Sequence, residues 1–445
     1  MENTEVLHND NASAGVVKAD NVTEEATGLP KEKKASELIS ANIALVHLMK
    51  GNIGIGVLSM PSALVNAGLA VGTAGLAVVA VITIHCMHLL VNATHMLTQR
   101  HNSVYLDYGE VVQLALLPYS RRLSNIGLKT INVFICTTQL GGNSVYVLFI
   151  ATSLKQLCEN LLGLDWSFYY YILLLWVPLV LLCLLRNLRL LAPVTVIATV
   201  CELYALAIVF YYIFRDPLPS VTSVPSTVSI SKLPLFFGTA IFTFEGIGIV
   251  LPLENRMKNP AHLRGLSGVL NTGMVMVACL YIATGFYGYL KYGEAASIGA
   301  VTLNLPDELL ANSARVSIAS AIFLTYPLQF YVLISILVPN LVVPYSAPDK
   351  VILYEYILRV SIVTVSFLLA SLVPYLNLFI SLAGALCMSS LSLIAPAIID
   401  TATNWEQIGR FRLAKNGFIF VFGMVGTFTG TILSVGAIAK KFQDS

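Results

Sequence analysis

The feature that most constrains this chain is a series of long apolar stretches, each able to cross a lipid bilayer as a helix. A spanning helix needs about 20 mainly apolar residues. Only 11% of the residues are charged, whereas soluble domains carry about a quarter. The sequence therefore predicts an all-α integral membrane protein with about eleven transmembrane helices. They are expected near residues 39–69, 71–97, 127–157, 168–185, 190–214, 233–253, 266–290, 313–338, 353–373, 375–400 and 415–438.

The ends of the chain lie outside the predicted transmembrane domain, which covers residues 39–438. Residues 1–38 are polar and are expected to form a disordered cytosolic tail, and residues 439–445 a short extracellular or luminal one. Lys and Arg divide roughly 18 to 7 between the two sets of loops, and the richer set faces the cytosol. The net charge of +2, with no basic run interleaved with aromatics, argues against a nucleic-acid partner and leaves the lipid bilayer.

Two of the predicted spans contain glycine clusters that indicate broken helices. The first span holds Gly51, Gly54 and Gly56, and the sixth holds Gly246 and Gly248. A glycine inside a helix costs about 1 kcal/mol relative to alanine, and unwound backbone at membrane depth must line a cavity or be buried in protein. Broken helices in corresponding positions of two halves indicate a transport site at the breaks. The alternative is that these glycines only allow close helix packing.

The ends of broken helices offer binding groups of both signs. Free N–H groups at the start of a half-helix can hold a carboxylate. Free carbonyl groups at the end of a half-helix can hold an ammonium group. A zwitterionic amino acid carries both groups, so the two breaks favour an amino acid as the substrate.

Ionisable side chains at bilayer depth are expensive, and they indicate function by default. His47 and Lys50 lie just before the first break, and Glu245 lies in the second, so these three are the candidates for proton coupling. His47 titrates near physiological pH, and the alternative is a neutral structural histidine. Lys50 either replaces a sodium ion as a fixed cation or reaches out to water. Glu245 either binds a proton or caps the broken helix, and the role of Glu202 in the fifth span stays open.

Several segments of the chain together match the pattern of a known family. They are HLMKGNIGIG at 47–56, HCMH at 85–88, TQLG at 138–141, SVY at 144–146, FTFEGIGIVLPLENRMKNP at 242–260, GYLKYG at 288–293, TLNLP at 302–306 and LQFYV at 328–332. In these segments the sequence resembles the proton-coupled amino acid transporters of the amino acid/auxin permease group, over residues 38–440. The resemblance implies an eleven-helix LeuT-like fold, in which two five-helix repeats are inverted and the first and sixth helices are broken. It also implies proton-driven symport of small neutral amino acids such as glycine, alanine and proline, with a role for His47 in proton coupling.

The resemblance further implies that the backbone of residues 52–56 and 242–246 forms the substrate site. Ile55 stands where members of the family commonly carry a small hydroxyl residue, so the choice of substrate stays open. No cysteine or histidine spacing fits a metal site, and no cofactor is expected besides the coupling proton. The expected substrate-binding residues are Asn52, Ile53, Gly54, Ile55, Gly56, Phe242, Thr243, Phe244 and Gly246.

Two other functions compete with transport as explanations of the sequence. An amino acid sensor would signal to a partner through the cytosolic tail and move little substrate. An intramembrane enzyme is disfavoured, because the sequence has no paired carboxylates, metal-ligand cluster or Ser/His arrangement. The sequence is compatible with the plasma membrane and with lysosomal or endosomal membranes.

Overall fold

Helices account for the architecture of the computed structural model, which describes residues 38–102, 105–186 and 191–443. The predicted tail, with its possible surface for a signalling partner, lies outside these residues except for residue 38. The main helices in chain order are α2 (Ala41–Asn52), α3 (Ile55–Ala67), α4 (Leu69–His101), α5 (Tyr108–Leu116), α6 (Arg121–Leu162), α7 (Phe168–Cys183), α8 (Leu191–Arg215), α9 (Leu233–Thr243), α10 (Ile247–Arg256), α11 (Val269–Tyr292), α12 (Leu309–Leu337), α13 (Val351–Leu372), α14 (Leu376–Ala383), α15 (Ala395–Thr403) and α16 (Arg410–Gln443).

Each predicted span corresponds to one of these helices, or to more than one in the first, sixth and tenth spans. Within the described residues, nine helical stretches are long and apolar enough to cross a membrane, and α2 with α3 forms a further span bent by 49°. The remaining predicted span is α7, a shorter apolar helix of 16 residues. The protein is therefore a multi-pass membrane protein. The last helix, α16, continues to Gln443 and takes in most of the predicted tail at 439–445.

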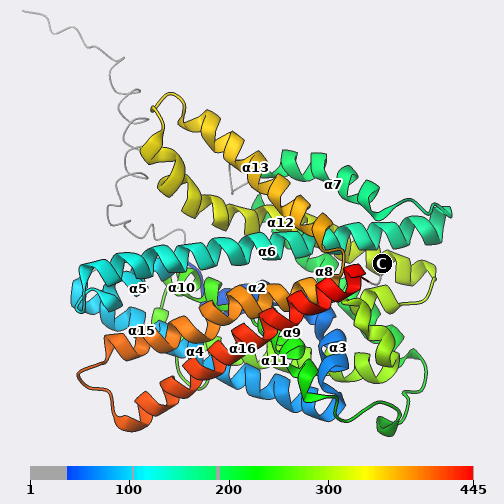
Figure 1. Cartoon of the computed structure of the whole chain (residues 1–445), viewed down its shortest axis with the longest axis horizontal. Coiled ribbons are helices and arrows are strands. Elements are labelled where there is room, and N and C mark those ends of the chain that lie inside the picture. The colour runs from blue at the N-terminus through cyan, green and yellow to red at the C-terminus, as the bar shows by residue number, and fades with distance from the viewer. Residues whose placement is uncertain (1–37, 103–104, 187–190, 444–445) are drawn as a thin grey trace, which may run out of the picture.

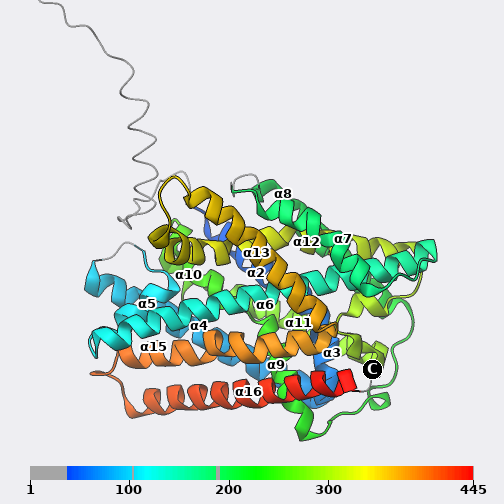
Figure 2. The ribbon, with the colours of Figure 1, turned by 45° about the horizontal axis from the view of Figure 1, so that its top comes forward.

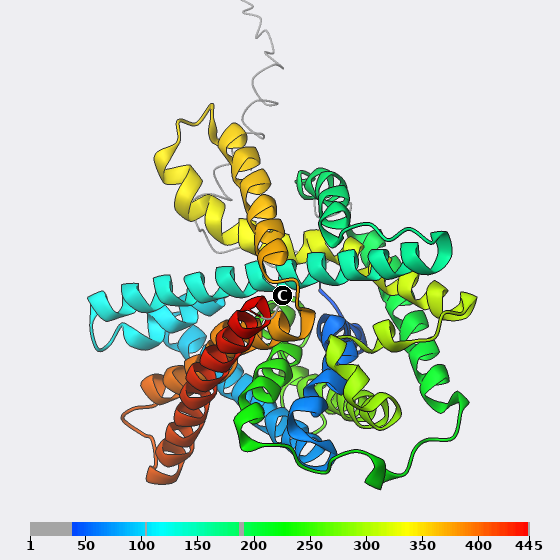
Figure 3. The same ribbon diagram turned by 45° about the vertical axis from the view of Figure 1, so that its right-hand side comes forward.

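Long helices surround the two broken ones. The half-helix α3 packs against α9 and α11, while α12 lies along α6 and α8. In Figure 1, α6 runs along the length of the bundle, and the hairpin of α12 and α13 projects from one side. Figure 2 shows α15 and α16 side by side along another face. In Figure 3 the short helices α3 and α9 lie inside the arrangement of longer ones. This arrangement places both breaks inside the bundle.

The tenth span is not the plain α-helix that its hydropathy predicts. Between α14 and α15 it passes through two π-helical segments, Gly384–Met388 and Ser390–Ile394. Here α9 approaches very closely, since a Cβ atom at Gly384 would lie 1.9 Å from the carbonyl oxygen of Gly238. The glycines at these two positions therefore bring α9 and the tenth span into backbone contact beside the second break.

A short parallel bridge ties the start of the first span to the end of the sixth. Ile39 lies opposite Met257. The Ile39 N–H donates to the carbonyl oxygen of Arg256 at 2.9 Å, and the Lys258 N–H donates to the carbonyl oxygen of Ile39 at 3.0 Å. The start of α2 and the end of α10, which are the ends far from the breaks, are thus joined through main-chain hydrogen bonds.

One group of charged side chains joins α13 to the end of α7. Arg359 and Glu355 of α13 form a buried ion pair at 2.8 Å, and Arg186 reaches the same carboxylate at 2.9 Å. Arg359 also donates to the carbonyl oxygen of Cys183 at the end of α7. The pair therefore fixes α13 against the end of α7, because an unpaired buried charge would be costly.

Candidate substrate site

The first break is narrower than the glycine cluster predicts. Helix α2 continues through Gly51 and ends at Asn52, and α3 begins at Ile55. Only Ile53 and Gly54 lie between them, both in extended backbone conformations. The free N–H groups of the site are therefore those of the first turn of α3. A Cβ atom at Gly54 would meet no other part of the described chain within 4 Å, so open space adjoins this residue.

The second break is a three-residue turn, Phe244 to Gly246, between the end of α9 at Thr243 and the start of α10 at Ile247. Phe242 and Thr243, which the sequence also assigned to the site, belong to the last turn of α9 and are buried. The carbonyl groups at this end of α9 have no partner within their own helix.

The two breaks lie in direct contact. A Cβ atom at Gly246 would lie 2.4 Å from Oδ1 of Asn52, and one at Gly56 would lie 2.7 Å from Cγ2 of Thr243. The Asn52 side chain also donates to the carbonyl oxygen of Leu48 at 2.8 Å. Close packing thus explains Gly56 and Gly246, whereas Gly54 adjoins open space. The two hypotheses for the glycines therefore hold at different positions: close helix packing at Gly56 and Gly246, and a break beside open space at Gly54.

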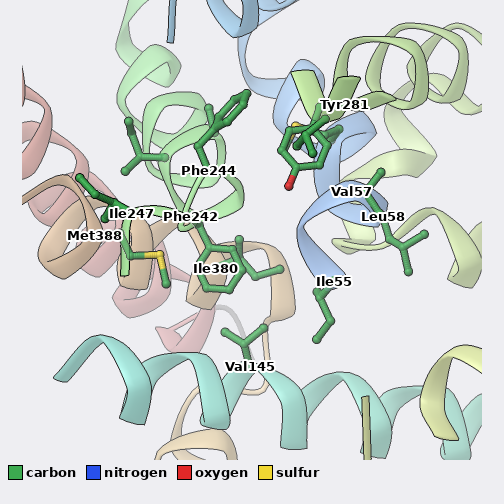
Figure 4. Packing of buried hydrophobic residues seen from close by; sticks show 14 of the residues in the cluster. Ile55, Val57, Leu58, Val145, Phe242, Phe244, Ile247, Tyr281, Ile380 and Met388 are labelled. Carbon is green, nitrogen blue, oxygen red and sulfur yellow. The ribbon is translucent and has the colours of Figure 1, made fainter. Parts of the chain in front are cut away.

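A residue that no sequence pattern marks links the two breaks. Tyr281 of α11 is fully buried, and its hydroxyl oxygen lies 2.5 Å from the carbonyl oxygen of Asn52 and 3.0 Å from that of Thr243. Its ring meets Phe244 edge to face, with centroids 5.0 Å apart. Figure 4 shows Tyr281 beside α3. One tyrosine among 20 in an apolar chain gives no sequence signal, and only the helix arrangement reveals this contact.

Apolar side chains border the breaks on the side of α6. Figure 4 shows Ile55 and Phe242 projecting toward α6, from which Val145 projects toward them, and Ile380 lies beside Phe242. All four side chains belong to the buried core. The residue that departs from the resembled family, Ile55, is 2% exposed. A side chain that entered this region would therefore meet hydrocarbon.

The ionisable candidates occupy different surroundings. His47 lies on an exposed face of α2. Lys50 donates from Nζ to the carbonyl oxygen of Thr195 on α8 at 2.5 Å, and it lies in the field of Glu202 on the same helix. Glu202 is 6% exposed. Lys50 is therefore held between α2 and α8 in the described structure, and Glu202 gains a charged neighbour that the sequence could not identify.

Glu245 in the second break lies within electrostatic range of two tyrosine side chains from other helices. Tyr146 of α6 lies close enough to Glu245 and to Glu202 to feel the charge of both carboxylates. Tyr281 also lies in the field of Glu245. Glu245 and Glu202, which are far apart in the sequence, are thus both within electrostatic range of the same tyrosine.

His85 and His88, the two histidines of the second span, lie apart from these ionisable side chains. His88 makes a hydrogen bond of 2.7 Å from Nε2 to Oδ1 of Asn271 on α11. His85 lies instead in the field of Lys415 and Asp400, near the opposite helix α16. Neither is brought to the breaks by any contact seen in the described residues.

A broken first and a broken sixth helix that meet inside a bundle are the arrangement of a secondary transporter. A family model described as transmembrane amino acid transporter protein matches residues 37–435. The chain belongs to this family. The match to the transmembrane amino acid transporter family covers nearly every described residue, including both breaks.

Two relatives agree with this assignment. The chain is 35% identical over 411 residues to the proton-coupled amino acid transporter-like protein pathetic of Drosophila melanogaster, covering 91% of this chain and 86% of that protein. It is 26% identical over 441 residues to the probable amino acid transporter skat-1 of Caenorhabditis elegans, covering 92% of each. The interpretation as an amino acid transporter rather than an enzyme is confirmed.

Solved structures confirm the fold of this family member. The chain is similar to Mhp1, a nucleobase-cation-symport-1 family transporter, in a closed conformation with bromovinylhydantoin bound. The TM-score is 0.50 and the identity 14%, over 94% of this chain and 96% of that one. The inward-facing conformation of Mhp1 gives the same TM-score and identity, over 93% and 95%. The predicted LeuT-like fold, with its broken first and sixth helices, is confirmed.

Proposed function

We propose that this amino acid transporter carries small neutral amino acids, of the glycine, alanine and proline class, together with protons. The observation that supports the proposal best is the meeting of the two helix breaks beside the open space at Gly54. The printed name of the relative from Drosophila melanogaster, proton-coupled amino acid transporter-like protein, points the same way.

In the proposed complex the substrate carboxylate binds the N–H groups at the start of α3, near Ile55 and Gly56. The positive end of the helix dipole favours an anion there. The ammonium group points to those carbonyl groups in the last turns of α2 and α9 that Tyr281 does not bind. Ile53 and Gly54 form the wall between these two poles, and Gly246 lets the second break approach. Because Ile55 and Phe242 line the approach to α6, small apolar side chains fit best.

The coupling proton is assigned to the cluster of ionisable side chains around the breaks, Lys50, Glu202 and Glu245, and no other cofactor takes part. If Lys50, Glu202 and Glu245 are all ionised, their summed charge is negative by one unit. One bound proton makes the group neutral, which suits a low-dielectric site because an uncompensated charge there is costly. His47 lies one turn before Lys50 on the exposed face of α2 and passes the proton between water and this group.

The proposed orientation places the N-terminus in the cytosol, as the Lys and Arg distribution predicts. The end of the bundle that carries the bridge between Ile39 and Met257 then faces the cytosol. Addition of an impermeant cysteine reagent to intact cells, with single cysteines placed at residues 120 and 165 of a cysteine-free background, tests this. Labelling of residue 165 alone agrees with the orientation, and labelling of residue 120 alone reverses it.

The experiment that tests proton coupling uses the purified full-length chain in proteoliposomes. Uptake of radiolabelled alanine and proline is measured with an imposed proton gradient and after a protonophore has dissipated it. Accumulation above the outside concentration is expected only with the gradient. Uptake that ignores the loss of the gradient would contradict proton coupling while leaving amino acid transport intact.

The role of His47 has its own test. His47→Ala should lose gradient-driven accumulation and keep exchange of labelled for unlabelled alanine, because exchange needs substrate binding but no net proton movement. His101→Ala, at the exposed end of α4, is the matched control and should behave like the unaltered protein. Normal accumulation by His47→Ala would remove this residue from the coupling pathway.

A further inference from the structure

Two carbonyl groups, one from each broken helix, converge on a single hydroxyl group inside the bundle. Asn52 is the last residue of α2, and Thr243 is the last residue of α9. Their carbonyl oxygens lie 2.5 Å and 3.0 Å from the hydroxyl oxygen of Tyr281. The carbonyl groups in the last turn of a helix have no partner within that helix. They also carry the negative end of its dipole.

Such a pair of carbonyl ends is a place for positive charge. In transporters with broken helices, unwound carbonyl groups and the C-terminal ends of half-helices coordinate the coupling ion. Here the proton of a phenol supplies the positive end of a dipole to both oxygens. The hydroxyl has only one proton, so the two carbonyl groups share it.

The phenol cannot readily leave this position. Tyr281 is 0% exposed, and its ring packs edge to face on Phe244 of the second break. The ring therefore contacts the same break that its hydroxyl group binds. A single residue of α11 thus touches the first break through one carbonyl group and the second through a carbonyl group and an aromatic ring.

We propose that the Tyr281 hydroxyl fills the position in which a cation would bridge the two helix breaks, so that the transport cycle needs no sodium ion. This rests on the transport function proposed above and names the group that holds its site together. A bridge built into the chain is present throughout the cycle and does not have to be bound and released. It closes the position to sodium by occupying it.

Two substitutions of Tyr281 distinguish the effect of losing its hydroxyl group from the effect of opening the space that its side chain fills. Tyr281→Phe keeps the ring on Phe244 and leaves both carbonyl groups without a donor. Loss of a buried hydrogen bond of ordinary strength should reduce alanine uptake by about five- to tenfold, and sodium should not restore it, because the ring still occupies the space. Tyr281→Ser opens the space, so a sodium ion can reach both oxygens.

The same helix provides the matched control. Tyr289 is also fully buried, and its hydroxyl group has no hydrogen-bond partner among the described residues. Tyr289→Phe therefore removes a buried hydroxyl group from α11 without removing a bridge. It should transport like the unaltered protein in every salt.

The test measures alanine uptake into proteoliposomes under one fixed proton gradient, in sodium chloride or in N-methylglucamine chloride. The unaltered protein should give equal rates in both salts. Tyr281→Ser should be slow in N-methylglucamine and several times faster in sodium. Tyr281→Asn, which keeps an amide oxygen beside the opened space, takes its place if the serine variant does not accumulate.

Three results would overturn the proposal: a sodium requirement of the unaltered protein, normal uptake by Tyr281→Phe, or equally low uptake by the opened variant in both salts. A purely structural role for Tyr281 predicts the last of these. Failure of the proposed function is a different result, because the unaltered protein would then show no uptake that depends on the proton gradient.

Discussion

Gly246 offers the sharpest test of how the two breaks fit together. Its backbone φ of −52° suits alanine, so any cost of Gly246→Ala comes from contact. The added methyl group would lie 2.4 Å from Oδ1, 2.6 Å from Nδ2 and 2.8 Å from Cγ of Asn52. The Asn52 side chain is buried and bound to the carbonyl oxygen of Leu48, and it can move away only by giving up that hydrogen bond.

The expected cost of this substitution follows from overpacking of a buried site, about 1–3 kcal/mol. That corresponds to about a 5- to 150-fold loss in the population of the arrangement in which the breaks touch. Gly246→Ala should therefore lower both the temperature of unfolding of the purified protein and its rate of alanine uptake. Uptake is measured in proteoliposomes after correction for the amount of reconstituted protein.

Gly248→Ala is the control for this prediction. Gly248 lies two residues further along in α10, and a Cβ atom there would meet no other part of the described chain within 4 Å. Alanine is favoured over glycine in a helix by up to about 1 kcal/mol, so this variant should be as stable as the unaltered protein or slightly more. Equal effects of the two substitutions, or a normal Gly246→Ala protein, would refute the contact between Gly246 and Asn52 as a requirement for function.

Two further predictions concern the site and the bundle. Gly54→Ala should fold normally, because the extended backbone at this position suits any residue and its surroundings are open. The variant should raise the KM for alanine, because the added methyl group lies beside the N–H groups of α3. An unchanged KM would show that the substrate binds elsewhere. Glu355→Gln leaves the 3% exposed Arg359 without its charge partner, so unfolding should become easier by about 3–5 kcal/mol. Arg186→Gln, which removes a half-exposed partner of the same carboxylate, should lower the unfolding temperature much less, and an equal loss from both variants would argue against burial as the cause.

The number of spans and the position of both breaks were predictable, because hydropathy and glycine spacing are local properties of the sequence. The width of each break was not. Gly51 and Gly56 keep helical geometry because neighbouring helices pack against them, with Ile249 beside the first and Thr243 beside the second. Glycine composition alone cannot distinguish a residue that unwinds a helix from one that admits a neighbour.

The side chains that connect helices could not be predicted either. Tyr281 is separated from Asn52 by 229 positions in the chain, and nothing in its own segment marks it. Glu202 could be noticed as a charge in an apolar span, but its proximity to Lys50 depends on how α2 lies against α8. The π-helical part of the tenth span was invisible for another reason, since a change from i+4 to i+5 hydrogen bonding leaves an apolar run apolar.

The bridge between Ile39 and Met257 gives the broken helices a mechanical constraint. The half-helices α2 and α10 meet at the breaks at one end and are tied by two main-chain hydrogen bonds at the other. Because α2 and α10 are held together at both ends, they can slide along each other but cannot move apart at one end. The two helices therefore separate only after both hydrogen bonds have broken. The amide hydrogens of Ile39 and Lys258 should therefore exchange with solvent deuterium no faster than this end of α2 and α10 opens. These two amides therefore report the separation of α2 from α10 without a bound substrate or an attached probe.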